Sequence, residues 1–356
     1  MSSLTQKTPV QIKDRLISAK HPPYIVAEMS ANHNGSLDRA FEIIEQAALA
    51  GADAVKIQSY RPDTITLNSR KPEFMVNGGL WDGKSLYELY EWAHMPWEWH
   101  RPLFEKAHDL GITIFSSPFD FTAVDLLESL NAPAYKIASF ELVDLPLIRY
   151  AAATGKPLIL STGMASQIEI AEAVEAAKDA GCEQLIVLHC VSGYPAPSSD
   201  YNLRTLPDIA ERFGVHAGLS DHTIDNAAAV ASVALGSCFI EKHFTLDRNA
   251  GGPDDSFSLE PKDLKSLCTD ARKAWEALGE VNYDRKQSEL GNLKFRRSLY
   301  VVKDIQQGER FTSDNVRSVR PAAGMAPKHY EAVLASTASQ NIEAGTALKP
   351  EHLNTD

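Results

Sequence analysis

Cysteine is scarce in this chain, and long apolar runs are absent. Its 4 cysteines are Cys182, Cys190, Cys238 and Cys268. None forms a CxxC pair, so a small disulfide-linked scaffold is excluded and reduced thiols are expected. Residues 1–21 are polar and contain no apolar segment of signal-peptide length. We therefore expect a cytoplasmic protein without a membrane segment.

Positive charge is also in short supply. The chain has 35 Lys and Arg against 47 Asp and Glu, which gives a net charge of −12 at pH 7. Nucleic acids and anionic membranes bind basic surfaces, so neither is expected as a partner. An anionic substrate would have to be held by individual lysines against this overall field. The 44% hydrophobic content over 356 residues suffices for one large domain and a small one.

No G-x-G-x-x-G motif follows the first apolar segment, which argues against an open, doubly wound sheet. Short apolar segments instead alternate with helical patterns, several of which end at glycine. The predicted strands are residues 24–28, 54–58, 112–116, 134–138, 157–161, 185–190, 216–220 and 238–243. Such parallel strands, repeated over about 250 residues, predict a closed (β/α)8 TIM barrel.

The periodic pattern stops near the end of the barrel segment. We expect a catalytic barrel domain at residues 1–278, a charged linker at 279–294 and a small domain at 295–356. The small domain contains an internal repeat that aligns Ile305 with Ile342. About sixty residues without disulfides make a marginal core, so this domain is expected to lean on another surface.

Polar side chains stand at the end of every predicted strand. Barrel active sites form at this carboxyl-terminal face, so these side chains are expected to meet at one mouth. Lys56 and Lys136 suit a small ligand that carries phosphate and carboxylate groups. The hydroxyls that could complete the oxygen shell are those of Ser117, Ser139, Ser161 and Ser220. Two alternatives remain open, because serines often cap helices and Lys56 could form a Schiff base as in barrel aldolases.

Two predicted strands carry a histidine at or just after their ends, and an acidic Gly-rich loop follows the second. The histidines are His222 and His243, and the loop at residues 251–255 includes Asp254. A lone buried histidine is commonly a core residue, but two beside carboxylates indicate a divalent-metal or acid–base site. Two histidines are too few for a closed zinc site. A bound ion would therefore keep positions open for water and a substrate oxygen, which suits activation of an aldehyde.

The segment between the second and third predicted strands is long and aromatic. It contains Trp81, Trp92, Trp97 and Trp99 at helical spacing. We expect these side chains to cover the barrel flank, with direct ligand contact as the alternative. The non-periodic residues 61–77 are expected to lie over the mouth.

Several motifs in order resemble those of the sialic acid synthase family. They are AEMSANHNGS (27–36), GADAVKIQ (51–58), AYKIAS (134–139), KPLILSTGM (156–164), GLSDHT (218–223) and EKHFTLDR (241–248). The similarity extends from residue 24 to residue 353 and includes a C-terminal module that looks like an antifreeze-like (SAF) domain. The resemblance implies a metal-dependent condensation of phosphoenolpyruvate with an amino sugar, which gives a nine-carbon 2-keto acid and phosphate.

The same motifs imply roles for individual residues. His222 and His243 would bind Mn²⁺ or Mg²⁺, and Glu28 would be the catalytic acid or base. The residues implied to surround phosphoenolpyruvate are Lys56, Ser117, Lys136, Ser139, Ser161, Ser220 and His222, and those implied to face the sugar are Gln58, Tyr194 and Asp254. Arg320 matches an arginine that enters the partner subunit's barrel, which implies a domain-swapped homodimer. Ser117 and Ser192 depart from the family pattern, which commonly has Thr and Asn there.

The aromatic segment narrows the resemblance further. Residues 79–90 and 96–99 look like those of the pseudaminic branch of the family, as do residues 56–60. This branch uses 2,4-diacetamido-2,4,6-trideoxy-L-altrose. The alternative is a branch that makes N-acetylneuraminate or legionaminic acid from N-acetylmannosamine or a related diacetamido sugar. A non-catalytic carbohydrate-binding or antifreeze-like protein is a further alternative. Such a protein would not need the charged residues at the strand ends, so their presence favours an enzyme.

Overall fold

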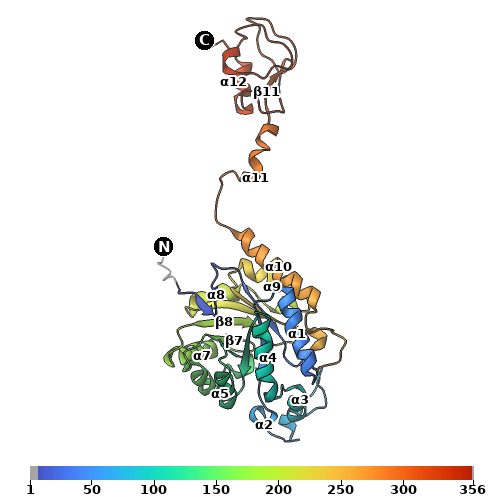
Figure 1. The fold of residues 1–356 in the computed structure, drawn as a ribbon. Coiled ribbons are helices and arrows are strands. Elements are labelled where there is room, and N and C mark those ends of the chain that lie inside the picture. Colours follow the sequence, from blue (N-terminus) through green and yellow to red (C-terminus); the bar gives the residue numbers. More distant parts are fainter. Residues whose placement is uncertain (1–6, 355–356) are drawn as a thin grey trace. The chain divides into compact units, whose positions relative to one another are not determined.

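Eight parallel strands close into a barrel, as the sequence predicts (Figure 1). The computed structural model describes residues 7–354. The barrel strands are β3 (Tyr24–Glu28), β4 (Ala54–Ser59), β5 (Thr113–Pro118), β6 (Tyr135–Ile137), β7 (Leu158–Ser161), β8 (Leu185–Cys190), β9 (His216–Asp221) and β10 (Phe239–His243). They follow one another around the barrel in chain order, and β10 closes it against β3. The predicted (β/α)8 fold is confirmed.

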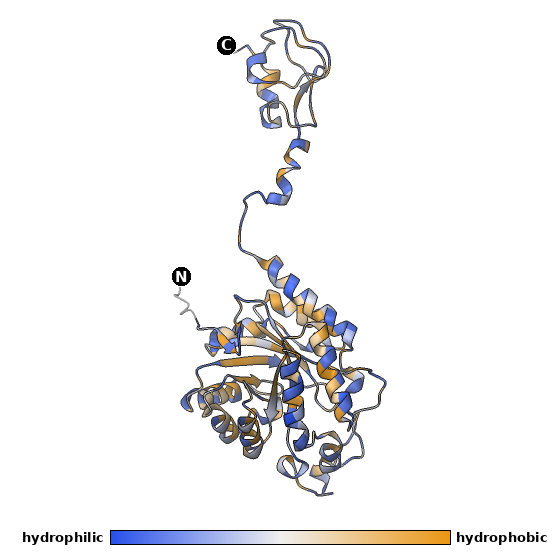
Figure 2. Cartoon of the chain, in the orientation of Figure 1, coloured by the Kyte–Doolittle hydropathy of each residue, from blue (hydrophilic) through white to orange (hydrophobic). Residues whose placement is uncertain are grey.

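Helices cover the outside of the barrel. They are α1 (Leu37–Ala50), α4 (Trp97–Asp109), α5 (Phe121–Ser129), α6 (Leu145–Ala152), α7 (Gln167–Asp179), α8 (Thr205–Arg212), α9 (Ala227–Ala234) and α10 (Pro261–Leu278). In α1, the Ser36 side chain accepts a hydrogen bond from the Arg39 amide, and Gly51 ends the helix at φ 87°. Ile43, Ile44 and Ala47 are buried on the side that faces the strands. Figure 2 shows the resulting division between apolar strands and polar outer helix faces.

Strand register brings the polar strand ends to one level of the barrel. Glu28 at the end of β3 is paired with Lys56 on β4 and with His243 on β10. Asp221 at the end of β9 is paired with Lys242. The carboxyl ends of parallel strands meet at the same edge, so these residues form one rim.

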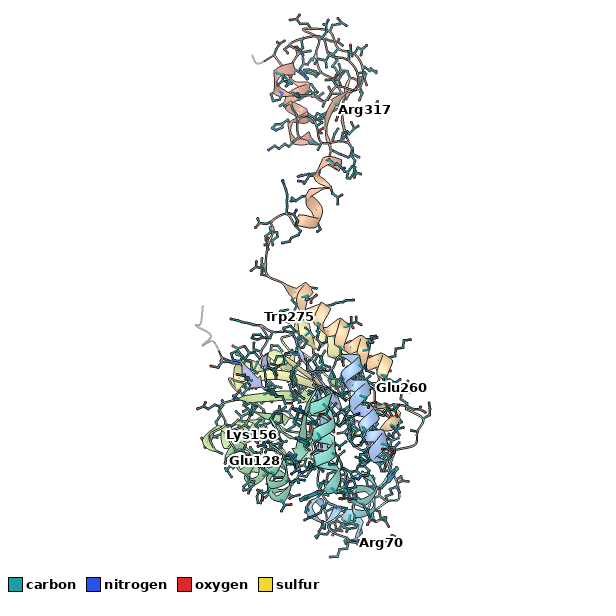
Figure 3. The ribbon with its side chains drawn as sticks, in the orientation of Figure 1. Arg70, Glu128, Lys156, Glu260, Trp275 and Arg317 are labelled. Atoms are coloured by element: carbon teal, nitrogen blue, oxygen red, sulfur yellow. The ribbon has the colours of Figure 1, made fainter. Side chains whose placement is uncertain are left out.

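An N-terminal hairpin, which the sequence pattern did not reveal, packs against apolar side chains of the barrel strands. It consists of β1 (Val10–Ile12) and β2 (Arg15–Ile17), two strands of three residues each. Ile12 and Ile17 are fully buried in a cluster that also contains Tyr24 at the first position of β3. The Trp275 indole N–H donates to the Ala19 carbonyl at 3.3 Å and holds the chain after the hairpin against α10. Figure 3 labels Trp275 on α10.

The β4–β5 connection contains α2 (Pro62–Ile65), a 3-10 turn at Pro72–Phe74 and α3 (Leu86–Ala93) before α4. Ser85 and Glu88 form a capping box, in which the Ser85 hydroxyl accepts from the Glu88 amide and the Glu88 carboxylate accepts from the Ser85 amide. No helix within residues 7–354 is long and apolar enough to cross a membrane.

The chain divides into two compact units, the first ending at Gly279 and the second starting at Glu280. The second unit contains α11 (Gln287–Leu290), β11 (Ser298–Val301), β12 (Val316–Val319) and α12 (Tyr330–Leu334). Short 3-10 turns occupy Leu293–Phe295, Pro327–His329 and Pro350–His352. The strands β11 and β12 pair antiparallel. Its core includes Leu299, Val316 and Val333, all completely buried.

The two copies of the internal repeat bond to each other reciprocally. The Ile305 amide donates to the Ile342 carbonyl at 2.9 Å, and the Ile342 amide donates back at 2.8 Å. The Val301 amide likewise donates to the Thr346 carbonyl at 2.9 Å, and the amide of Ala338 donates to the Glu309 carbonyl at 2.8 Å. The repeat that matches Ile305 with Ile342 also matches Val301 with Ala338 and Glu309 with Thr346. The last two bonds are therefore equivalent to each other.

Candidate functional site

A cavity of about 180 Å³ opens at the carboxyl ends of the barrel strands. Most of the residues predicted from sequence to form the site line it. They are Glu28, Lys56, Gln58, Lys136, Ser139, Tyr194, Ser220, His222, His243 and Asp254. Their elements range from β3 to the loop after β10, so the fold gathers side chains that are far apart in the chain.

Three predicted residues lie outside the lining. Ser117 lies directly behind it, where its Oγ accepts a hydrogen bond from Lys56 Nζ at 3.1 Å. Ser161 is fully buried, and its hydroxyl has no hydrogen-bond partner among residues 7–354. Arg320 is exposed and belongs to the second unit.

Two lysines and two carboxylates form a buried cluster in the lining of the cavity. Lys56 Nζ lies 2.8 Å from Glu28 Oε2 and 3.6 Å from Glu241 Oε1. Lys136 Nζ lies 3.2 Å from the same Glu241 oxygen. Sequence reasoning missed Glu241. Its position two residues before His243 in a strand was the available signal, because alternate side chains share one face.

The two carboxyl groups of this cluster have pKa values shifted in opposite directions. Burial raises the pKa of Glu28, and Lys56 opposes that rise only in part while the charge of Glu241 adds to it. Burial also disfavours ionisation of Glu241, but Lys136 and Lys56 outweigh it and the pKa of Glu241 is lowered. Carboxyls with diverging pKa values are typical of acid–base chemistry. Glu28 is therefore suited to carry a proton, and the two lysines favour the ionised form of Glu241.

The two histidine rings adjoin each other, with centroids 5.3 Å apart. His222 Nδ1 lies 2.7 Å from the Val191 carbonyl oxygen, which can only accept, so this nitrogen carries the hydrogen and Nε2 is the ring nitrogen that could bind a metal. His243 Nδ1 is buried without a hydrogen-bond partner among the described residues. Burial and the neighbouring positive charges hold the pKa of His243 well below its usual range.

These histidines fit a divalent cation with open coordination positions. Burial lowers the pKa of His222, but Cys190, whose sulfur lies 3.9 Å from Nδ1, raises it overall. Metal binding would release any such proton. No group of three or more His, Cys, Asp or Glu side chains with ligand geometry occurs within residues 7–354. The remaining ligands would therefore be water and substrate oxygens.

A chain of hydrogen bonds crosses from Glu28 to the acidic loop after β10. Gln58 Nε2 donates to Glu28 Oε1 at 2.9 Å and to Ser30 Oγ at 3.0 Å. Ser30 in turn donates to Asp254 Oδ2 at 2.5 Å. The predicted loop thus brings a carboxylate to the mouth. Burial raises the pKa of Asp254, against the hydrogen bonds from Ser30 and Ala31.

Aromatic side chains enclose the cavity on the side of the histidines. The Tyr194 ring lies 4.5 Å from that of His222 and 6.1 Å from that of Trp81. Trp81 lines the cavity, and its indole N–H donates to the Pro253 carbonyl at 3.0 Å. The insert's tryptophans were expected to cover the barrel flank, with ligand contact as the alternative, and the position of Trp81 in the cavity lining favours the alternative for this residue. Cover of the flank fits Trp99, which packs edge-on against His33 and does not line the cavity.

Part of the cavity wall is apolar. The residues that form it come from the β4–β5 connection and the end of β5, and are Tyr60, Ile65, Leu89, Tyr90, Ala93 and Phe119. The Tyr60 ring packs edge-to-face on those of Tyr90 and Phe119, with centroid distances of 5.7 and 5.1 Å. Because Ile65 lies in the non-periodic segment predicted over the mouth, that prediction is confirmed for this residue.

Gly163, after β7, permits a close approach of two hydroxyls. Its amide donates to Ser139 Oγ at 3.1 Å. A Cβ at this position would lie 2.1 Å from Ser192 Oγ and 2.8 Å from Ser139 Oγ. Together with the unpartnered Ser161 hydroxyl, these groups offer hydrogen bonds to an anion.

An eight-stranded parallel barrel with lysines, carboxylates and histidines at its carboxyl rim defines a (β/α)8-barrel enzyme. The NeuB family model matches residues 43–283, and the SAF domain model matches residues 296–354. The chain belongs to the NeuB family and is an enzyme of the sialic acid synthase type.

Relatives over nearly the whole chain agree with this placement. The pseudaminic acid synthase of Campylobacter jejuni is 47% identical over 92% of this chain and 95% of its own length. That of Helicobacter pylori is 44% identical over 93% and 98%. The N,N'-diacetyllegionaminic acid synthase of Campylobacter jejuni is 39% identical over 90% and 96%. The solved N-acetylneuraminic acid synthetase of Leptospira borgpetersenii has a TM-score of 0.72 at 30% identity, with 81% of this chain and 95% of that chain covered.

Proposed function

We propose that this enzyme condenses phosphoenolpyruvate with 2,4-diacetamido-2,4,6-trideoxy-L-altrose and water, giving pseudaminic acid and phosphate in a reaction that depends on a divalent metal. The observation that carries the proposal is that two lysines and a group of apolar side chains line the same cavity. The first suits phosphate and carboxylate, and the second suits a deoxy, acetylated sugar. The names and identities of the pseudaminic acid synthase relatives support the choice of product.

Phosphoenolpyruvate would bind beside the charged cluster. Lys56 and Lys136 neutralise its phosphate and carboxylate, and Ser139 and Ser220, which line the cavity, donate hydrogen bonds to its oxygens. Ser117, outside the lining, holds Lys56 in place. Lys56 Nζ lies within 3.1 Å of both Glu28 Oε2 and Ser117 Oγ.

Glu28 would move the proton. As C3 of phosphoenolpyruvate bonds to the aldehyde carbon of the sugar, the protonated Glu28 carboxyl donates its proton to the aldehyde oxygen. The resulting carboxylate then takes a proton from the water that adds to C2, and loss of phosphate leaves the 2-keto acid. A Mn²⁺ or Mg²⁺ ion on His222 and His243 would polarise the aldehyde oxygen. The Gln58 amide holds Glu28 Oε1 in place at 2.9 Å.

The sugar would lie between the histidines and the apolar wall. Gln58, Tyr194 and Asp254 supply its polar contacts. A 6-deoxy sugar ends in a methyl group, and its acetamido groups carry two more methyls. Leu89, Ala93 and Phe119 can cover such groups, whereas they leave extra hydroxyls without a hydrogen-bond partner.

We expect the trideoxy diacetamido sugar to be preferred over N-acetylmannosamine by roughly 10- to 200-fold in kcat/KM, the range for one methyl-sized apolar contact. The measurement is phosphate release from phosphoenolpyruvate with each sugar, with the product identified by mass spectrometry. A 2,4-diacetamido sugar of the legionaminic series serves as the matched comparison. Preference for N-acetylmannosamine would make the enzyme an N-acetylneuraminate synthase.

We further propose that Arg320 acts in the barrel of a partner subunit within a domain-swapped homodimer. Its position in the family motif and its exposure in the second unit support this assignment. Mixing Arg320→Ala with Glu28→Gln subunits should restore activity, because one site of each heterodimer then contains neither change. No recovery after demonstrated subunit exchange would count against action in trans. Arg310→Ala, in the same unit, is the control and should keep activity alone.

A further inference from the structure

Each of the two histidines directly follows one member of a buried ion pair. Lys242 Nζ lies 2.8 Å from Asp221 Oδ2, and their side chains are 1% and 0% exposed. The two residues are register partners on β9 and β10. Neither lines the cavity, whereas His222 and His243 both do. Because neighbouring side chains in a strand point to opposite faces, the ion pair lies behind the histidines.

Lys242 also holds the backbone of the residues that follow His222 in the chain. Its Nζ donates to the carbonyls of Thr223 and Asp225, both at 2.7 Å, and lies 3.2 Å from Thr223 Oγ1. Asp221 Oδ1 accepts from the Thr223 amide at 2.9 Å. The chain on the far side of His222 is thus held to the residue that precedes His243.

We propose that Asp221 and Lys242 are positioning residues that set the spacing of the His222 and His243 rings for a divalent cation. The inference rests on the metal site of the proposed function. A buried ion pair is weak evidence for a stabilising role, since apolar replacements of similar volume are often equally stable. Groups that hold metal ligands from behind, in contrast, typically contribute 10- to 100-fold to metal affinity.

The test measures Mn²⁺ binding by titration calorimetry without substrates, alongside thermal unfolding in EDTA. Lys242→Met should raise the Kd for Mn²⁺ by about 10- to 100-fold. The metal concentration that half-saturates turnover should rise in parallel, while kcat at saturating Mn²⁺ stays near that of the wild type. Should Lys242→Met not fold, the double variant Asp221→Asn with Lys242→Met carries the measurement, because it leaves no unpaired buried charge.

The double variant also separates positioning from stability. It should regain most of the thermal stability but not the Mn²⁺ affinity, because the bonds from Nζ to Thr223 and Asp225 remain lost. Asp53→Asn is the matched control. The carboxylate of Asp53 accepts from the Ile25 amide at 2.8 Å and pairs with Arg272 at 3.1 Å, just before β4 and away from the cavity. This variant should lose stability and keep its Kd within about twofold, which is less than the loss expected behind a ligand.

Three outcomes would overturn the inference. If the double variant regains affinity together with stability, the pair serves the fold alone. Unchanged Kd in folded Lys242→Met would refute the positioning role while leaving the metal site intact. Absence of Mn²⁺ binding by the wild type would refute the metal site and the positioning role together.

Discussion

Chelation with EDTA is expected to abolish turnover, and added Mn²⁺ or Mg²⁺ to restore it. His222→Ala and His243→Ala should each lose at least about 10³-fold in kcat at any metal concentration. An ion that polarises an aldehyde oxygen contributes several kcal/mol, and each 1.36 kcal/mol is tenfold in rate. Steady-state phosphate release measures the effect, and calorimetry with Mn²⁺ checks that binding is lost as well.

A buried histidine outside the cavity provides the control. His100 lies on α4, and its Nε2 is 2.7 Å from Ser59 Oγ. His100→Gln keeps a polar group in that position and should retain both metal binding and activity. Full activity of His222→Ala after exhaustive chelation would remove the basis for a metal-dependent mechanism.

Glu28→Gln is expected to lower kcat by about 10²- to 10⁴-fold, the usual contribution of a positioned acid–base group. The amide has the shape of the carboxyl but cannot exchange a proton. KM for phosphoenolpyruvate should change less than kcat, because Lys56 and Lys136 remain. Glu28→Asp keeps a carboxyl group on a shorter side chain, so its kcat should lie between those of the wild type and Glu28→Gln. A glutamine variant with wild-type kcat would assign the proton transfer elsewhere.

The thermal stability of Glu28→Gln tests whether the pKa of Glu28 is raised in the folded protein. In the folded protein its pKa lies above the unfolded value, so between the two values the folded state holds the extra proton. Ionisation of Glu28 therefore destabilises the fold as pH rises through this window. Glu28→Gln should remove that loss, so its thermal midpoint should equal or exceed that of the wild type at neutral pH.

The barrel could be predicted because the signals for its strands and helices lie in short, continuous segments of the sequence. The buried segment from Tyr24 to Glu28, the capped helix α1 and the terminating Gly51 are all short-range signals. Polar residues at strand ends then gather at one rim through topology alone. Glu28, Lys56 and His243 share a level in the register, as expected for adjacent parallel strands.

What the sequence did not reveal depends on long-range contacts. Trp81 reaches the cavity through its bond to Pro253, which is far along the chain. In the sequence, nothing distinguishes Glu241 from other charged residues. Its role depends on its contacts with Lys56 and Lys136, which belong to two other strands. The hairpin of β1 and β2 has strands too short to show a period. In each case a distant partner defines the role of the residue.

Ile305 and Ile342 hold equivalent places in the two repeat copies, yet they pair with each other. Equivalent residues can meet in this way only across a twofold axis. The repeat also matches Tyr300 with Thr337 and Arg310 with Ala347. The bridge between Tyr300 and Ala347 is therefore equivalent to the bridge between Arg310 and Thr337. The small domain is thus built like a symmetric dimer whose halves were joined into one chain.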